Sequence, residues 1–351
     1  MKMKKIATKF SAIALMALAL TSCNKKANVA PEADKEFQSA IDASAATQIV
    51  TDIDMLVAQA SEYSYVAFYT NITGAGSNTV TVKRDTTLNM NTIIYNNAKC
   101  LDGAVRNGTV FVDYTKCSTG TVTSGGQQYI RNPNHMAVVT FSNYSVNKYV
   151  VTSGSSITVK NTTPAGYTRT ITPLTWNIAG TLILADTTDN IGNKYDNDIK
   201  WVGNLNKTLV NSTTSSSIHP SSLLPIRWIT GMYGVQTGTA NTSNNAVNPN
   251  GINAIVKYSG SATGFTTKDG APSTYSYSIL DGKELYRNFG CSPDYYINPE
   301  QHPIRKGVVE FKTGDKAVRT IYYGDEKNNE YCDNSGIIYI NGISYTVDFW
   351  K

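Results

Sequence analysis

The chain has 351 residues, of which 41% are hydrophobic and only 16% are charged. This length allows one large domain or two ordinary ones. After residue 62 the sequence has no long stretch rich in Ala, Glu, Lys and Leu. It is instead rich in Thr, Ser, Asn, Val, Ile and Tyr, which excludes a helical bundle or coiled coil and is typical of β-strands and turns.

The first 22 residues have the parts of a secretory signal. Four lysines precede an apolar run from Phe10 to Leu20, whose 11 residues are too few to span a bilayer. Leu20-Thr21-Ser22-Cys23 then resembles a bacterial lipobox, and this resemblance implies cleavage before Cys23 and acylation of its thiol and amine. We therefore predict a lipoprotein signal peptide over residues 1–22, with membrane lipid bound through Cys23. An ordinary signal peptide with an incidental cysteine is the alternative.

Cleavage of this signal changes the charge of the chain. The formal charge of +5 falls to +1, because the mature chain keeps 27 of the 31 basic residues and all 26 acidic ones. A nearly neutral chain has no general field that would attract phosphates, so we expect no nucleic-acid partner.

Four cysteines follow the lipobox, at Cys100, Cys117, Cys291 and Cys332. An oxidising periplasm favours disulfides, and four cysteines allow three connectivities. We prefer Cys100–Cys117 and Cys291–Cys332, because each pair stays within one half of the chain; four free buried thiols are the alternative. The sequence has no C-x-x-C, so we predict neither a zinc site nor redox chemistry.

Composition and periodicity divide the mature chain. Residues 23–34 form the acylated cysteine and a flexible tether. Residues 35–62 contain neither Gly nor Pro and repeat apolar side chains at steps of three and four, which predicts an amphipathic helix, whole or broken in two. We expect it to pack on a β-body, with a stalk or partner-binding helix as the alternative. A first β region over 63–210, a polar linker over 211–222 and a second β region over 223–351 follow.

The fold class predicted beyond the helix is all-β, with antiparallel, sandwich-like sheets. Alternating patterns predict strands over 65–69, 78–82, 92–95, 109–114, 136–141, 148–152, 156–160, 169–172, 181–184, 199–202, 253–258, 273–279 and 308–311. Near the C-terminus, Asn341-Gly342 between residues 337–340 and 343–350 predicts a type I′ hairpin. Segments 92–112 and 320–339 both have the order strand, cysteine-bearing loop, strand. A duplicated β-module would explain this similarity, as would chance or the strand and turn pattern that hairpins have in common.

Several strand and turn segments resemble a group of uncharacterised β-rich lipoproteins of Bacteroidetes-type bacteria. These segments are 92–114, 138–147, 199–208, 260–264, 306–311 and 332–342. The resemblance covers most of the chain after about residue 90. It implies a β-rich fold and no assigned activity.

Catalytic and metal sites are poorly supported by the sequence. His135, His219 and His302 each have a proline nearby and are typical of loops. Residues 186–198 have the composition of a calcium loop, but their spacing departs from the EF-hand pattern, and a polar β-turn is the favoured interpretation. We therefore predict no catalytic residue, no metal site and no cofactor.

Aromatic and glycan-related features give weaker indications. Trp176, Trp201, Trp228 and Trp350, with tyrosine runs such as Tyr322-Tyr323, are suited to stacking on sugars, although cross-strand packing explains them better. Two tripeptides, 85–87 and 186–188, resemble the O-glycosylation acceptor of the same bacteria.

The sequence thus favours a non-enzymatic lipoprotein of the outer membrane, at its periplasmic face or at the cell surface. It would present a β-sheet surface to a protein or glycan partner. The alternative is a carbohydrate-binding module or a carbohydrate-active enzyme, and a purely structural envelope component is a third hypothesis.

Overall fold

The computed structural model describes residues 36–62, 79–85, 87–99, 104–115, 133–164, 174–188, 194–211, 255–267, 273–288, 304–324 and 335–349. Within these ranges the chain forms one helix, α2 (Gln38–Glu62), and a series of β-strands. The strands are β1 (Thr79–Asp85), β2 (Met90–Lys99), β3 (Val105–Asp113), β4 (Met136–Val146), β5 (Tyr149–Val151), β6 (Ser156–Asn161), β7 (Thr175–Thr188), β8 (Lys194–Asn211), β9 (Ile255–Thr266), β10 (Ser273–Ile279), β11 (Leu285–Asn288), β12 (Ile304–Thr313), β13 (Arg319–Tyr323), β14 (Ser335–Ile340) and β15 (Ile343–Asp348).

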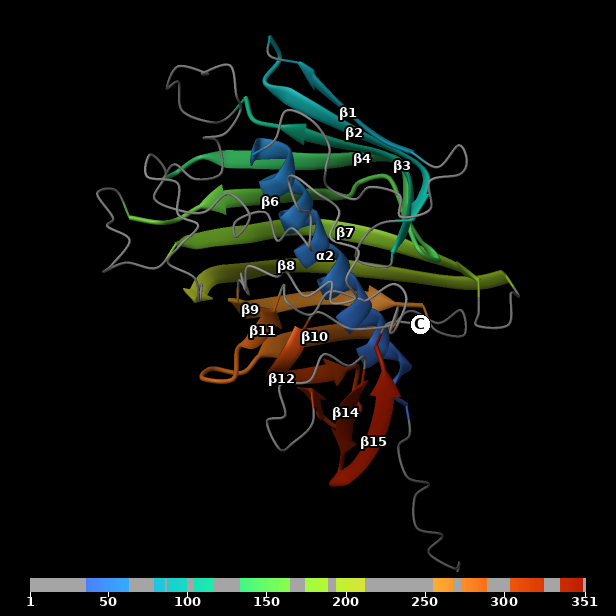
Figure 1. Ribbon diagram of the computed structural model, residues 1–351. Coiled ribbons are helices and arrows are strands. Elements are labelled where there is room, and N and C mark those ends of the chain that lie inside the picture. Colours follow the sequence, from blue (N-terminus) through green and yellow to red (C-terminus); the bar gives the residue numbers. More distant parts are fainter. Residues whose placement is uncertain are drawn as a thin grey trace, which may run out of the picture. The chain divides into compact units, whose positions relative to one another are not determined.

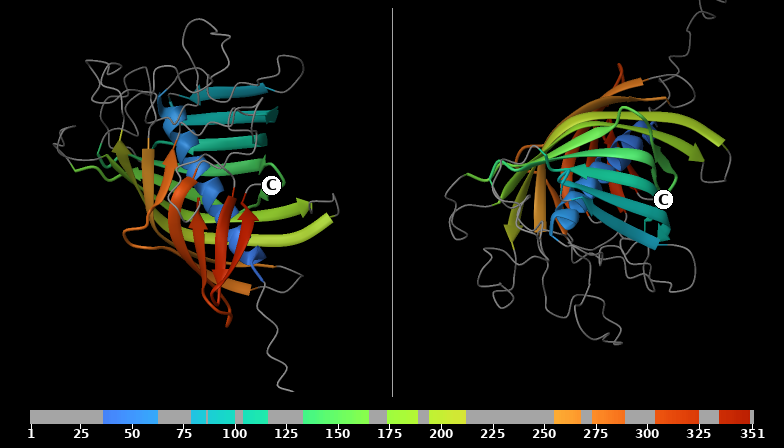
Figure 2. Two further views of the ribbon diagram at one scale, coloured as in Figure 1. Left: turned by 60° about the horizontal axis from the view of Figure 1, so that its bottom comes forward. Right: turned by 90° about the horizontal axis from the view of Figure 1, so that it is seen from above.

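All the described strands belong to one antiparallel sheet. Its order is β1-β2-β3-β4-β5-β7-β8-β9-β10-β12-β13-β14-β15, with β6 placed between β4 and β7, and β11 between β9 and β12. Neighbours in the sheet are thus mostly neighbours in the sequence, as in a meander. Figure 1 shows α2 crossing this sheet obliquely, and the two views of Figure 2 place the helix within its concave face. We call that face the inner face and the opposite one the outer face.

Helix α2 is buried on every side. Four consecutive residues, Gln48, Ile49, Val50 and Thr51, point about 100° apart around its axis, and each is at most 2% exposed. Its closest neighbours are the central strands β7, β8 and β9, together with β4 and β6. The helix therefore supplies the second layer of the fold, and apolar side chains of the inner face complete the core around it.

Glycines inside the long strands allow the sheet to bend around the helix. Gly180 of β7 has a φ of 152° and Gly260 of β9 has a φ of 117°. A Cβ at either position would overlap a backbone carbonyl of the neighbouring strand, that of Ser156 or Asn204 respectively. Only glycine permits this conformation and this close approach, so these positions mark where the strands curve.

The expected fold class is confirmed: an antiparallel all-β body follows an N-terminal helix. The helix is continuous rather than broken in two. It packs on the β-body, which is the expected arrangement, and does not form a stalk. It also takes the place that a second sheet has in a sandwich, because every described strand lies in one sheet. The two β regions predicted from the sequence share that sheet, since β9 pairs with β8 along its whole length.

The C-terminal hairpin is also confirmed. Asn341 and Gly342 have φ values of 51° and 82°, the positive values that a type I′ turn requires, and Ile340 pairs with Ile343. The segments of the internal similarity form antiparallel pairs, β2 with β3 and β13 with β14. The predicted strands at 65–69 and 169–172, and the polar linker beyond residue 211, lie outside the described residues.

Candidate functional site

The inner face holds a buried network of charged side chains, centred on Asp52 of α2. Arg287 of β11 donates from Nη2 to Asp52 Oδ1 at 2.8 Å and from Nη1 to Thr51 Oγ1 at 3.0 Å. Arg106 of β3 approaches the other carboxylate oxygen at 3.6 Å. Both guanidinium groups are almost fully buried. One helical carboxylate thus connects strands from opposite halves of the sheet.

Two further ion pairs fix the helix on the inner face. Lys207 of β8 donates to both carboxylate oxygens of Asp54, at 2.8 and 2.7 Å, while its Nζ lies 4.3 Å from the centre of the Trp176 ring. Just before the helix, Arg319 of β13 lies 3.6 Å from the Glu36 carboxylate and donates to the Glu36 backbone carbonyl at 2.9 Å. Every one of these cations is buried, so each depends on its partner for solvation.

Buried tyrosines complete the polar interior. The hydroxyls of Tyr277 and Tyr323 lie 3.2 Å apart, and Tyr275 donates to the carbonyl of Lys200 at 3.0 Å. Burial raises the pKa of Tyr275, Tyr277 and Tyr323, and also that of Tyr149, because the phenolate form loses its hydration. These groups stay neutral at physiological pH.

This interior network suits a structural role better than a catalytic one. The side chains of Asp52 and Asp54 are 6% and 2% exposed, and those of their cationic partners at most 5%. A substrate would have to displace the helix to reach them. Their hydrogen bonds instead fix the register and rotation of α2 against the sheet.

The outer face of the central strands has a different chemistry. Exposed positions alternate with buried ones along β8, β9 and β10, as expected for a sheet with one solvated side. Between Lys200 of β8 and Lys257 of β9, the outward positions carry mainly hydroxyl and amide groups, with Val202 and Phe265 beside them. We define the hydroxyl–amide face as Asn177 of β7, Asn204 and Asn206 of β8, Ser259, Ser261 and Thr263 of β9, and Ser276 and Ser278 of β10.

Strand register brings these side chains into contiguous rows. Asn204 lies opposite Ser261, which lies opposite Ser278, and Thr263 lies opposite Ser276. Residues directly opposite each other in an antiparallel pair project from the same face. The hydroxyl–amide face is therefore a continuous surface across four strands, and the helix supports its other side.

Three asparagines organise one end of this face. Asn177 Nδ2 donates to Asn204 Oδ1 at 2.5 Å and to Asn206 Oδ1 at 3.1 Å. These bonds turn the two acceptor oxygens toward Asn177. The amide nitrogens of Asn204 and Asn206 are then directed away from it, on side chains that are exposed to solvent.

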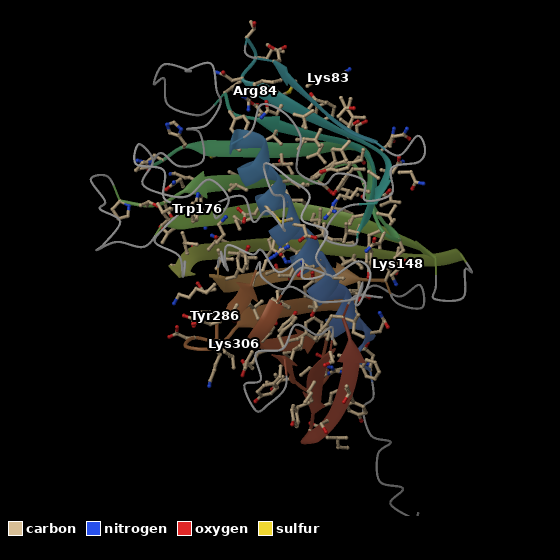
Figure 3. The ribbon with its side chains drawn as sticks, viewed as in Figure 1. Lys83, Arg84, Lys148, Trp176, Tyr286 and Lys306 are labelled. Atoms are coloured by element: carbon tan, nitrogen blue, oxygen red, sulfur yellow. The ribbon has the colours of Figure 1, made fainter. Side chains whose placement is uncertain are left out.

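Charged side chains surround the hydroxyl–amide face without entering it. Lys160 of β6 pairs in register with Asn177, while Glu310 and Lys312 of β12 pair with Ser278 and Ser276. Next to this face, Lys306 Nζ of β12 lies 4.5 Å from the centre of the Tyr286 ring of β11 (Figure 3). Nearby, Lys257 binds Glu284 at 3.1 Å, and the pKa of Glu284 is lowered by its backbone hydrogen bond and by Lys257.

The structure covers only some of the residues singled out from the sequence. Cys23 and the four disulfide candidates, Cys100, Cys117, Cys291 and Cys332, all lie outside the described residues, as do His219 and His302. His135 lies directly before β4 and is 8% exposed, and its carbonyl accepts a bond from Asn161. It is a buried residue of the β-body and does not adjoin the hydroxyl–amide face.

Two other sequence candidates have structural roles. Asp186, first residue of the proposed calcium loop, is 3% exposed and binds Lys148 at 3.1 Å; within the described ranges no cluster of metal-ligating side chains occurs. Trp176 and Trp201 are buried, and Trp201 donates to Thr47 of the helix at 3.2 Å, so both serve packing. Trp228 and Trp350 lie outside the described residues.

Sequence reasoning missed the hydroxyl–amide face. Residues 273–279 are predicted as a strand, and their alternation, Ser-Thr-Tyr-Ser-Tyr-Ser-Ile, was the available signal for a polar outer face. No protein family, curated protein or solved structure matches the chain. In the described part of the chain, no helix has the length and apolarity needed to cross a bilayer.

Proposed function

We propose that this protein is a lipid-anchored envelope lipoprotein with a non-enzymatic role, which presents the outer face of its sheet to a partner. The observation that carries the proposal is the hydroxyl–amide face. It is an exposed, contiguous surface on the central strands, with a packed helix behind it. Such a surface is suited to binding, because its side chains are held on regular strands rather than on loops.

The sequence supports the anchor. The basic residues, the short apolar run and Leu20-Thr21-Ser22-Cys23 stand in the order of a lipoprotein signal. Several acyl chains on Cys23 would hold the protein durably, since each buried CH₂ contributes about 0.8 kcal/mol. Asn24 after Cys23 resembles lipoproteins sorted to the outer membrane, and Lys25-Lys26 differs from the acidic signal for surface export, which favours the periplasmic face.

Metabolic labelling with palmitate tests the anchor. The native chain should incorporate label and fractionate with the outer membrane, whereas a Cys23→Ala variant should remain unlabelled. Equal labelling of the two chains contradicts the anchor. Protease treatment of intact and permeabilised cells then reports which side of the membrane the protein faces.

A photo-crosslinking amino acid tests the presenting surface in the native envelope. Placed at Ser261, at the centre of the hydroxyl–amide face, it should give a discrete adduct. Placed at Thr140, an exposed outward position on β4 away from that face, it should give none or a different one. Identical adduct patterns at both positions contradict the proposal.

A further inference from the structure

We propose that the hydroxyl–amide face is a binding site for an uncharged polysaccharide, whose chain lies across strands β7 to β10. This inference rests on the proposed presenting role and names the class of partner for the same surface. Polysaccharide binding at this face does not require acylation of Cys23. A negative binding result can therefore be told apart from a negative result for the anchor.

The first argument is charge. A solvated protein surface usually carries about 25–35% Lys, Arg, Glu and Asp with both signs interspersed. None of the eight residues of the hydroxyl–amide face is ionisable, and the nearest charges, Lys160, Lys200, Lys257, Glu310 and Lys312, lie at its margins. Solubility alone does not require this neutral area. Its neutrality matches a ligand without charge.

The second argument is strand composition. Asn is depleted in strands, which favour Thr, Val and aromatic residues. Here β8 places Asn204 and Asn206 outward, and β9 places Ser259 and Ser261 outward. The outward positions of β8 and β9 thus carry small hydrogen-bonding groups where bulkier strand formers would also fit. Such groups are suited to contact with a polar ligand.

The third argument is hydrogen-bonding capacity. Serine and threonine hydroxyls donate and accept at once, and an asparagine amide offers separate donors and acceptors. The bonds from Asn177 direct the donor nitrogens of Asn204 and Asn206 away from their own cluster. Sugar hydroxyls have the same dual character. Rows about 4.8 Å apart, with outward side chains about 7 Å apart along each strand, match contacts to successive sugar rings.

The fourth argument is the presence of apolar groups beside the polar rows. Val202 is 40% exposed and lies opposite Thr263, while Phe265 is half-buried opposite Lys200 and Thr274. Sugar rings present C–H faces as well as hydroxyl edges, and aliphatic and aromatic side chains cover such faces. A protein interface would instead be expected to centre on buried aromatic or Arg anchors. The face itself contains neither residue type.

Affinity electrophoresis of the mature chain, purified in detergent, tests the proposal. The probes are xylan, galactomannan, mixed-linkage β-glucan and dextran, with polygalacturonate as the charged comparison. At least one neutral polysaccharide should retard the chain in a saturable way, without release of reducing ends. Retardation by polygalacturonate alone, or by no polysaccharide, overturns the proposal, as does turnover of the retarding polymer at this face.

Matched variants locate the site. Ser261→Arg places a long charged side chain at the centre of the hydroxyl–amide face, and Thr140→Arg makes the same change at an exposed outward position of β4. Ser261→Arg should weaken retardation at least tenfold, whereas Thr140→Arg should leave it within twofold. The milder Asn204→Ala, which removes one amide without adding bulk, should weaken it severalfold. Thermal unfolding confirms that each variant is folded, and equal retardation of all variants overturns the assignment.

Discussion

Asp52 of the helix and Arg287 of strand β11 form a buried ion pair of 2.8 Å, although 235 positions separate them in the sequence. Arg106 reaches the same carboxylate from β3, at 3.6 Å. A single helical side chain therefore joins an early and a late strand of the sheet. This arrangement explains how a long meander, whose other contacts are mainly between neighbours in sequence, is held around one helix.

Replacing Asp52 by Asn should destabilise the fold strongly. Two buried guanidinium groups would face each other without the carboxylate, and removal of one partner of a buried ion pair costs about 3–5 kcal/mol. We expect a loss of that size in the free energy of unfolding, measured by urea denaturation. Asp281→Asn, in an exposed turn, is the matched control and should change stability by less than about 0.5 kcal/mol. Equal stabilities of the two variants contradict the role of Asp52.

The Asp54–Lys207 pair should show strong coupling in a double-mutant cycle. Lys207→Met leaves the Asp54 carboxylate buried without its cation. Asp54→Leu leaves the Lys207 ammonium group buried without its carboxylate. Combining the two removes both charges and fills the site with apolar groups. We expect the double variant to be at least about 2 kcal/mol more stable than the sum of the single losses implies. Simple additivity would show that the pair contributes no specific interaction.

Gly203 is required where β8 passes the buried indole of Trp201. Its backbone is not in the left-handed region, but an added Cβ would overlap the Trp201 ring and crowd Ala262. Gly203→Ala should therefore cost about 1–3 kcal/mol through overpacking. Ser261→Ala, at an exposed position on the adjacent strand, should cost less than about 0.5 kcal/mol. A neutral Gly203→Ala variant would mean that the ring is not held against the strand.

The buried tyrosines predict unfolding at alkaline pH. The pKa of Tyr149, Tyr275, Tyr277 and Tyr323 is raised in the folded protein, mainly by burial, whereas unfolded tyrosines titrate near pH 10. Above about pH 10 the unfolded chain binds fewer protons than the folded one, so stability is fully present below that pH and falls as pH rises. These tyrosines should ionise only together with loss of circular dichroism, and ionisation of all tyrosines in a still folded protein would contradict their burial.

A single variant tests the contribution of one buried tyrosine to the pH dependence of stability. Tyr277→Phe removes one buried hydroxyl and its contact with Tyr323. The fall in stability above about pH 10 should then be less steep, by about one proton in the pH dependence.

The sequence predicted those parts of the fold that depend on neighbours in the chain. The period of residues 35–62 located the helix, and Asn341-Gly342 located the last hairpin, because hydrophobic periodicity and turn preferences are local in the sequence. Long strands were underestimated. Gly180 and Gly203 resemble strand breaks in a sequence, yet they lie paired inside β7 and β8. Four-residue β11, with Arg and Asn among its residues, gave no alternating signal and was missed.

The burial of the polar side of α2 was beyond sequence reasoning. The acidic residues of an amphipathic helix usually face solvent, but Asp52 and Asp54 are buried, with Arg106, Arg287 and Lys207 of distant strands neutralising their charges. Such pairings depend on the curvature of the sheet. The hydroxyl–amide face was missed for the same reason, since its rows exist only once β8, β9 and β10 are in register.

Native-state hydrogen exchange of the mature protein tests most directly the claim that the helix seals the inner face and leaves the outer face for binding. The backbone amides of residues 42–57, within the buried part of α2, should exchange only through global unfolding, with an opening free energy equal to that from urea denaturation. Addition of a retarding neutral polysaccharide should leave the helix unchanged and slow exchange in β8 to β10. Rapid exchange throughout α2 in the folded protein, or ligand protection centred on the helix, would contradict the account.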